Sequence, residues 1–221
     1  MKRLAIIHTV KPVLNSFETR IREAMPDKDL IIHNLFDDFL ATDPSPDGVG
    51  YFTIDNKKRL LNDIFSAELT GADLIVTTCS TLTPIVAEIR PFVKVPIVAI
   101  DDAMAEAAVE KGSKIMVLAT AKSTIPSTIA RLRQAAQDIT KEIVLDSTFN
   151  ETAYHAMKRF DLKTHDDIVL DQAKSISGYD VIVLAQASMA HLEREIERIA
   201  NTPTFSTPDR CVQQIKKILF S

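Results

Sequence analysis

The feature that most constrains the fold of this chain is an internal repeat whose copies lie slightly more than a hundred residues apart. Residues 71–79 read GADLIVTTC and residues 178–186 read GYDVIVLAQ, so that Cys79 falls opposite Gln186. Two further pairs of segments repeat in the same order: 3–9 with 114–120, and 95–102 with 202–209. This period is far too long for a solenoid, so the repeat predicts two similar lobes.

Short apolar runs that end in polar residues alternate along the chain with stretches of helical periodicity. Runs of this kind predict strands that are buried on both faces of a parallel sheet. Strands are expected at 4–7, 30–33, 74–77, 95–100, 114–120, 142–145 and 180–184. Helices are expected at 14–25, 57–69, 82–89, 102–110, 127–138, 166–176 and 210–219, with Asp101 and Asp102 capping the fourth.

This alternation predicts an α/β protein of two pseudo-symmetric lobes, each with a parallel sheet flanked by helices. Lobe one is expected to comprise residues 1–100 with the C-terminal helix 208–221, and lobe two residues 101–207. Residues 41–56 contain two prolines and two glycines, which predicts a loop, and its length suggests a cover for a site.

Composition excludes several functional classes. A formal net charge of -4 provides no basic field for nucleic acid, and five glycines leave no glycine-rich phosphate loop. No apolar run reaches the length of a membrane span, and the N-terminal segment is expected to be a strand rather than a signal peptide. Two cysteines form no disulfide framework, which favours a cytoplasmic location.

The two lobes are expected to face each other with a site in the cleft where the carboxyl ends of their strands meet. Lobe one would contribute His8, Thr9, Cys79, Ser80 and Thr81. Lobe two would contribute Thr120, Ser123, Thr124, Gln186 and Ser188. Hydroxyls and backbone amides that converge in this way can bind a small carboxylate, although such clusters also occur as ordinary caps and turns.

Cys79 and His8 are the candidate acid/base groups. Cys79 follows a strand and precedes an expected helix, whose N-terminus would favour a thiolate; the alternative is a thiol packed as a small hydrophobe. His8 is either a second acid/base group or an imidazole hydrogen-bonded at a strand end. Cys211 lies inside the last expected helix and is interpreted as a core residue.

The two-lobe repeat, the Cys79–Thr81 turn and the stretch 118–124 (LATAKST) resemble the aspartate/glutamate racemase superfamily. That superfamily includes hydantoin racemases, maleate isomerases and arylmalonate decarboxylases. The resemblance implies a homodimeric enzyme that needs no cofactor or metal and acts on a small carboxylic or amino acid, with Cys79 as the first catalytic thiol. Residues 184–189 read LAQASM, so Gln186 stands where the family places its second cysteine.

An amide neither gains nor loses a proton near neutral pH, so Gln186 excludes a two-thiol mechanism. Three hypotheses remain. The first is an isomerase or racemase that uses Cys79 with His8 or a water. The second is a single-cysteine decarboxylase of a malonate-type acid, although the resemblance places the thiol of those enzymes in lobe two. The third is a carboxylate-binding protein without turnover.

Overall fold

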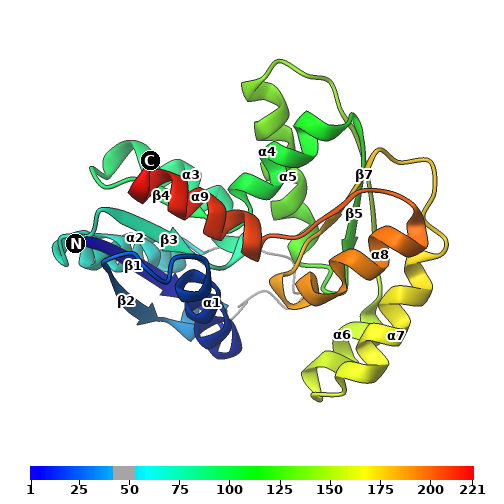
Figure 1. The fold of residues 1–221 in the computed structure, drawn as a ribbon, viewed down its shortest axis with the longest axis horizontal. Helices are drawn as coiled ribbons and strands as arrows, with labels where there is room; N and C mark the ends of the chain where they lie inside the picture. Colours follow the sequence, from blue (N-terminus) through cyan, green and yellow to red (C-terminus); the bar gives the residue numbers. More distant parts are fainter. Residues whose placement is uncertain (42–52) are drawn as a thin grey trace. The chain divides into compact units, whose positions relative to one another are not determined.

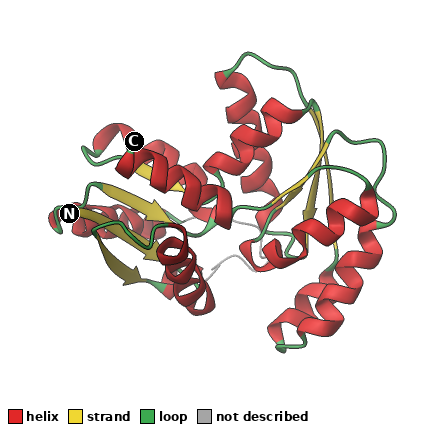
Figure 2. Ribbon diagram, viewed as in Figure 1, coloured by secondary structure: helices red, strands yellow, loops and turns green. Residues whose placement is uncertain are grey.

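The structure is a computed structural model that describes residues 1–41 and 53–221. Its strands are β1 (Lys2–His8), β2 (Leu30–Phe36), β3 (Leu74–Thr77), β4 (Ile97–Ala99), β5 (Lys114–Ala119), β6 (Val144–Phe149), β7 (Val181–Leu184) and β8 (Thr204–Phe205) (Figure 1). Its α-helices are α1 (Lys11–Ala24), α2 (Ile54–Leu69), α3 (Thr83–Ile89), α4 (Asp102–Lys111), α5 (Thr124–Asp138), α6 (Glu151–Lys158), α7 (Leu162–Ala173), α8 (Glu193–Ala200) and α9 (Pro208–Phe220) (Figure 2). Short 3-10 helices are η1 (Asp38–Ala41), η2 (Ser80–Leu82), η3 (Arg90–Phe92) and η4 (Ala187–Leu192).

The described chain divides into two compact units. One unit comprises Met1–Asp102 and Pro208–Ser221, and the other comprises Ala103–Thr207. We call them lobe one and lobe two. Each lobe contains one four-stranded sheet. Among the described residues, no helix has both the length and the apolar character that crossing a membrane requires.

The two sheets have equivalent topology. Sheet one has the order β2-β1-β3-β4 and sheet two the order β6-β5-β7-β8, so the first strand of each lobe lies between the second and the third. Every pairing is parallel; Leu4 pairs with Leu74 in sheet one, and Ile115 pairs with Val181 in sheet two. The expected α/β fold of two lobes with parallel, helix-flanked sheets is therefore confirmed.

Helices cover both faces of sheet one. Alternate strand residues, such as Ala5 and Ile7, pack in one cluster with Leu60 and Ile64 of α2 and with α3. The helices α1 and α9 contact the sheet strands and each other, and α9 buries Cys211, Val212, Ile215 and Leu219. The interpretation of Cys211 as a core residue is confirmed, because its side chain is fully buried.

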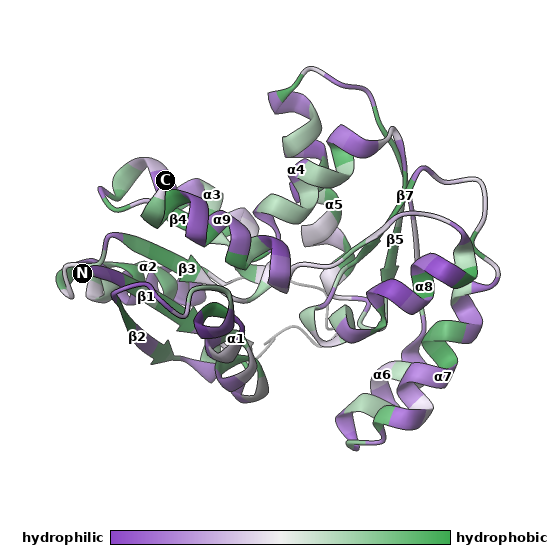
Figure 3. Cartoon of the chain, viewed as in Figure 1, coloured by the Kyte–Doolittle hydropathy of each residue, from purple (hydrophilic) through white to green (hydrophobic). Residues whose placement is uncertain are grey.

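Sheet two has the same layered construction. Ile115, Val117 and Ala119 pack with α4 and α5, whereas Met116 and Leu118 pack with α7, α8 and η4. Figure 3 shows hydrophobic colouring along β3, β5 and β7, whose residues are buried apart from Lys114. Burial on both faces explains why these strands have continuous apolar runs rather than alternating ones.

The repeated Gly-x-Asp sequence has the same structure in each lobe. Gly71 and Gly178 both adopt left-handed backbone conformations, with φ values of 71° and 75°. Two residues later, the Asp73 carboxylate accepts a bond from the Arg3 backbone N–H at 2.8 Å, and the Asp180 carboxylate accepts one from Lys114 at 2.9 Å. These bonds lower the pKa of both carboxyl groups. The motif therefore joins the amino ends of neighbouring strands.

Several local expectations differ from the structure; among them, the helix expected at 166–176 is observed as α7, Leu162–Ala173. The helix α6 (Glu151–Lys158) was not expected; Asn150 caps it by accepting a bond from the Ala153 N–H at 3.2 Å. The expected strand 142–145 is displaced to Val144–Phe149. The predicted end of the loop 41–56 is wrong, because α2 already begins at Ile54, with Thr53 as its N-cap. The rest of that loop, residues 42–52, lies outside the described residues.

Candidate active site

The strand order places a topological switch point in each lobe. In sheets of this order the connections diverge between the first and third strands, and ligands bind beyond the carboxyl ends of those strands. In lobe one these ends lead to His8 and to the turn that carries Cys79. In lobe two they lead to Thr120 and Gln186.

Cys79 lies two residues after β3 in an extended conformation, with φ -127° and ψ 115°. Its carbonyl oxygen accepts a bond from the Leu82 N–H at 3.0 Å, which starts the 3-10 turn η2. The side chain is half-buried and touches the edge of the core cluster of lobe one. Ser80 and Thr81 follow it and are also half-buried. The thiol is therefore more accessible than that of Cys211.

His8 is completely buried at the end of β1. One ring nitrogen, Nδ1, lies 3.0 Å from the hydroxyl of Thr78, and the other, Nε2, lies 3.0 Å from Oδ1 of Asn34. The Asn34 amide donates to Glu18 at 2.6 Å, and Glu18 accepts two bonds from Arg22. Burial lowers the pKa of His8, although the Asn34 bond and the Glu18 charge oppose that effect. With both nitrogens bonded, the geometry favours a structural role for this imidazole.

Thr9 and Thr78 accompany these two residues at the carboxyl edge of sheet one. Thr9 is buried directly after His8. The Thr78 backbone N–H donates to the Ile7 carbonyl oxygen at 3.1 Å, which continues the β1–β3 pairing up to Cys79. Thr78 therefore joins His8 to the turn that carries the thiol.

In lobe two, the side chain of Gln186 bridges the ends of β5 and β7. Its Oε1 accepts bonds from the Thr120 N–H at 2.7 Å, the Ala121 N–H at 2.9 Å and the Thr120 hydroxyl at 3.1 Å. Thr120 and Ala121 are buried and Gln186 is half-buried. Gln186 can therefore bind anything further only through its NH₂ group.

The other predicted residues of lobe two lie on the two turns that Gln186 joins. Ser123 is half-buried before α5, and the Thr124 hydroxyl donates to the Ala121 carbonyl oxygen at 2.9 Å. Ser188 is exposed within η4. The Thr120 and Thr124 hydroxyls thus have partners within the lobe.

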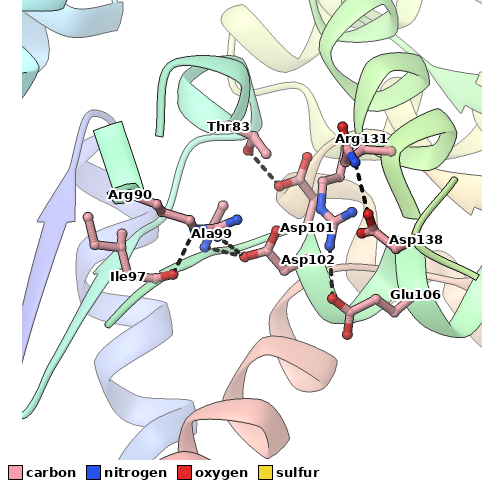
Figure 4. Close-up of polar contacts among 10 residues, drawn as sticks. Thr83, Arg90, Ile97, Ala99, Asp101, Asp102, Glu106, Arg131 and Asp138 are labelled. Atoms are coloured by element: carbon pink, nitrogen blue, oxygen red, sulfur yellow. Dashed lines mark hydrogen bonds and ion pairs between the residues drawn. The ribbon is translucent and has the colours of Figure 1, made fainter. Parts of the chain in front are cut away.

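The carboxylates of Asp101 and Asp102 accept hydrogen bonds from neighbouring elements (Figure 4). The Thr83 hydroxyl of α3 donates to Asp101 at 2.6 Å. The Asp102 carboxylate accepts bonds from Arg90 and, at 2.8 Å, from the Ala99 N–H. The capping role expected for Asp101 and Asp102 stays a prediction. The bonds described here tie the start of α4 to the elements that precede it.

An additional cluster of charged side chains follows β2. Arg59 donates to the buried Asp37 carboxylate, and the guanidinium lies 4.6 Å from the centre of the Phe39 ring. Burial and the adjacent Asp37 carboxylate raise the pKa of Asp63 to about 6. Asp37 is also tied to β1, because its backbone N–H donates to the His8 carbonyl oxygen at 2.9 Å.

Thr78, Asn34 and the Asp37–Asp63 pair were not among the residues predicted from the sequence. Thr78 had a usable signal, because it lies beside Cys79 in the same turn. Asn34 and Asp63 had none, because each acts on a residue that is distant in sequence. Within the described ranges, no group of three or more His, Cys, Asp or Glu side chains is placed to bind a metal ion.

Several solved structures that share this fold are described as racemases or as racemase homologues. An allantoin racemase from Klebsiella pneumoniae superposes with a TM-score of 0.68 at 16% identity, over 99% of this chain and 87% of that one. An aspartate racemase homologue from Pyrococcus horikoshii OT3 gives 0.67 at 18% identity over 99% of both chains. A glutamate racemase from Francisella tularensis, solved with D-glutamate, gives 0.70 at 13% identity over 99% of this chain and 81% of that one.

These likenesses define a class: two-lobed α/β proteins with a parallel sheet in each lobe. The sequence assigns the family within that class. The model of the Asp/Glu/Hydantoin racemase family matches residues 9–215, and the chain belongs to this family. A comparison with curated protein sequences found no match.

Proposed function

We propose that this protein is a cofactor-independent enzyme of the racemase or isomerase type. Its substrate would be a small carboxylic acid or amino acid, and Cys79 would transfer the proton at the α-carbon. The observation that carries the proposal is a half-buried thiol at the switch point of lobe one, in a chain that matches the racemase family over residues 9–215.

The proposed reaction begins with the Cys79 thiolate, which removes the α-proton and leaves an enediolate on the substrate carboxylate. Hydroxyl and N–H donors of Thr9, Ser80 and Thr81 would stabilise the developing charge. Return of a proton from Cys79 regenerates the substrate, whereas a proton from water on the opposite face gives the other enantiomer. In the second case that water becomes hydroxide, which takes the proton from the Cys79 thiol, so that both the thiolate and the water are restored.

His8 and Gln186 are poor proton donors in this scheme. Both nitrogens of His8 have partners, and an amide does not titrate near neutral pH. We therefore assign His8 the role of holding Thr78 beside Cys79, and water the role of second acid. The substrate contacts proposed in lobe two remain Thr120, Ser123, Thr124, Gln186 and Ser188. The effect of each substitution on KM tests them.

Gln186 also favours a second candidate function, a single-cysteine decarboxylase of a malonate-type acid. Cleavage of the carbon–carbon bond would release CO2 and leave an enediolate on the remaining carboxylate. The Cys79 thiol would protonate that carbon, and water would then restore the thiol. This reaction needs one proton donor, so it does not require a second titrating group in lobe two.

The deciding experiment is incubation in D2O with aspartate, glutamate, hydantoins, allantoin and a phenylmalonate. Proton NMR should show loss of the α-proton signal for the substrate of an isomerase, and chiral chromatography should show the other enantiomer. CO2 release from the malonate with no α-proton exchange elsewhere would establish the lyase instead.

Cys79→Ala and Cys79→Ser should each reduce the exchange or decarboxylation rate by at least a thousandfold, because no other group replaces the thiol. Cys211→Ala is the matched control, since that thiol is fully buried in α9 and is not one of the proposed substrate contacts. Carboxylate binding that survives Cys79→Ala with no turnover of any compound would leave the third hypothesis, a binding protein.

Assembly and location are also proposals. We propose a cytoplasmic homodimer, on the basis of the family membership and of a chain with only two cysteines. Light scattering of the purified protein tests the dimer, because a mass of 24.5 kDa is that of one chain.

A further inference from the structure

Three hydrogen-bond donors in lobe two converge on a single oxygen. They are two consecutive backbone N–H groups, of Thr120 and Ala121, and the Thr120 hydroxyl, at 2.7, 2.9 and 3.1 Å from Gln186 Oε1. Consecutive N–H groups that point to one centre form a site for a carbonyl or carboxylate oxygen. We call these three donors the oxygen cradle.

The cradle lies directly beyond the paired ends of β5 and β7. β5 and β7 pair up to Leu118 and Leu184, and the Ala185 N–H donates to the Leu118 carbonyl oxygen at 3.0 Å. The Gln186 side chain continues this connection beyond the last backbone bond. Its own carbonyl oxygen accepts a bond from the Met189 N–H at 3.0 Å, which fixes the start of η4.

A cysteine at position 186 would not make this connection. The Gln186 oxygen lies two bonds further from the backbone than a cysteine sulfur would, and sulfur is a weak acceptor. The glutamine thus removes a titrating group from lobe two and adds a link between two turns, 120–124 and 186–192. The three donors occupy both lone pairs of the amide oxygen, so that this oxygen accepts no further hydrogen bond.

We propose that Gln186 is a positioning residue, whose amide oxygen occupies a carboxylate- and amide-binding cradle and thereby holds the 120–124 turn in place. Shortening the side chain would open the cradle to a small molecule with an amide or carboxylate oxygen. The consequence for catalysis rests on the proposed function, because Thr120, Ser123 and Thr124 are proposed substrate contacts. The cradle itself can be tested without any activity.

The test is amide hydrogen exchange of the full chain, followed by NMR. In Gln186→Ala, the Thr120 and Ala121 amide protons should exchange at least tenfold faster than in the wild type. Gln186→Glu should restore slow exchange, because a carboxylate oxygen accepts the same three bonds. Gln186→Met keeps the length of the side chain without an acceptor, so it should behave like Gln186→Ala even if the alanine variant folds poorly.

Acetamide and acetate are the probes for the opened cradle. In Gln186→Ala they should shift the Thr120 and Ala121 amide signals saturably and slow their exchange, and in the wild type they should not. Gln134→Ala is the matched control, since Gln134 is exposed and its amide donates to Asp138 on the same helix. Unchanged exchange in Gln186→Ala and Gln186→Met would overturn the proposal. Equal signal shifts in the wild type and in all variants would mean that the probe is an adventitious additive only. That result would overturn the proposed binding of amides and carboxylates in the cradle.

These outcomes separate the cradle from the proposed function. Loss of protection in Gln186→Ala with no turnover of any substrate by the wild type would uphold the cradle and reject the enzyme. If the protein is active, Gln186→Glu should recover kcat/KM relative to Gln186→Ala by at least tenfold, which a general loss of packing would not produce.

Discussion

His8 and Asp63 show how burial decides the chemistry of individual residues in lobe one. Judged from the local sequence alone, both would be ordinary titratable side chains. The fold brings partners to both, and these partners change their pKa values. His8 bonds a threonine that lies 70 positions away, and Asp63 lies beside a carboxylate on another element. Their pKa values shift in opposite directions, which gives two separate predictions for stability against pH.

Replacement of His8 by glutamine should flatten the pH dependence of stability between pH 7 and pH 5. Burial lowers the pKa of His8 below 6.5, so the unfolded chain binds more protons than the folded one in this range. The free energy of unfolding of the wild type therefore falls as the pH drops through the folded-state pKa, by at most about 1.4 kcal/mol per pH unit. Urea denaturation at several pH values measures this slope.

The control for His8→Gln is His33→Gln, since His33 is exposed on β2. That variant should keep the slope of the wild type. An identical slope in His8→Gln and in the wild type would show that His8 is not the group that titrates.

Asp63→Asn should stabilise the protein near pH 7.5 by about 1 kcal/mol, a value reduced for partial solvent screening. The pKa of Asp63 is raised to about 6, which means that its charged form is less favourable in the folded protein than in the unfolded chain. The protein is therefore more stable at low pH, where Asp63 is protonated, and it loses this stability as the pH rises through 6. The asparagine amide donates to Asp37 at every pH and removes this loss. The gain should vanish near pH 4.

The same denaturation experiments check the asparagine variant, with Asp38→Asn as the control because Asp38 is exposed in η1. If Asp63→Asn destabilises the protein at pH 7.5, then Arg59 compensates the Asp63 charge and the ionised carboxylate does not lower the stability of the fold.

At the scale of elements, the repeated Gly-x-Asp sequence is a structural device. The sequence indicates its importance through repetition, and the structure shows that it lies at the amino ends of the strands, opposite the proposed site. Gly178 has a left-handed φ, but its nearest side-chain atom is Lys114 Nζ at 3.9 Å from an added Cβ. At Gly112, an added Cβ would lie 2.2 Å from Asp180 Cβ.

Gly178→Ala should therefore cost about 1 kcal/mol, the backbone penalty alone. Gly112→Ala should cost more stability, because the added Cβ would push Asp180 aside. Its carboxylate would then move away from the Ser113 and Lys114 N–H groups, from which it accepts hydrogen bonds. Thermal denaturation of both variants measures the difference. Equal losses would mean that Asp180 moves freely and contributes little to the β5–β7 junction.

At the scale of the whole molecule, lobe one is built from two separate parts of the chain. Its core includes α9, which contacts α1, β3 and β4, whereas lobe two is a continuous segment. The helix that follows β4 belongs mostly to lobe two, and the helix that follows β8 belongs to lobe one. A change in the last helix should therefore affect the lobe that is distant in sequence.

Ile215→Ala should destabilise lobe one by about 2–4 kcal/mol, since Ile215 is fully buried in α9. Hydrogen exchange should accelerate in β1 and β3 and remain slow in β5 and β7. Ile218→Ala is the control on the same helix, because Ile218 is exposed and its loss should cost less than about 0.5 kcal/mol. Equal acceleration in both lobes would show that they unfold as one unit.

The sequence by itself determined the two-lobed α/β fold and placed Cys79 and Gln186 at matching strand ends. These features depend on local patterns: apolar runs, helical periodicity and a repeat that is visible without a structure. Only the tertiary structure decided what His8, Gln186 and Asp63 do there. Their partners come from other strands and helices, and burial and hydrogen bonding change the chemistry of a side chain only once the folded chain has brought those groups together.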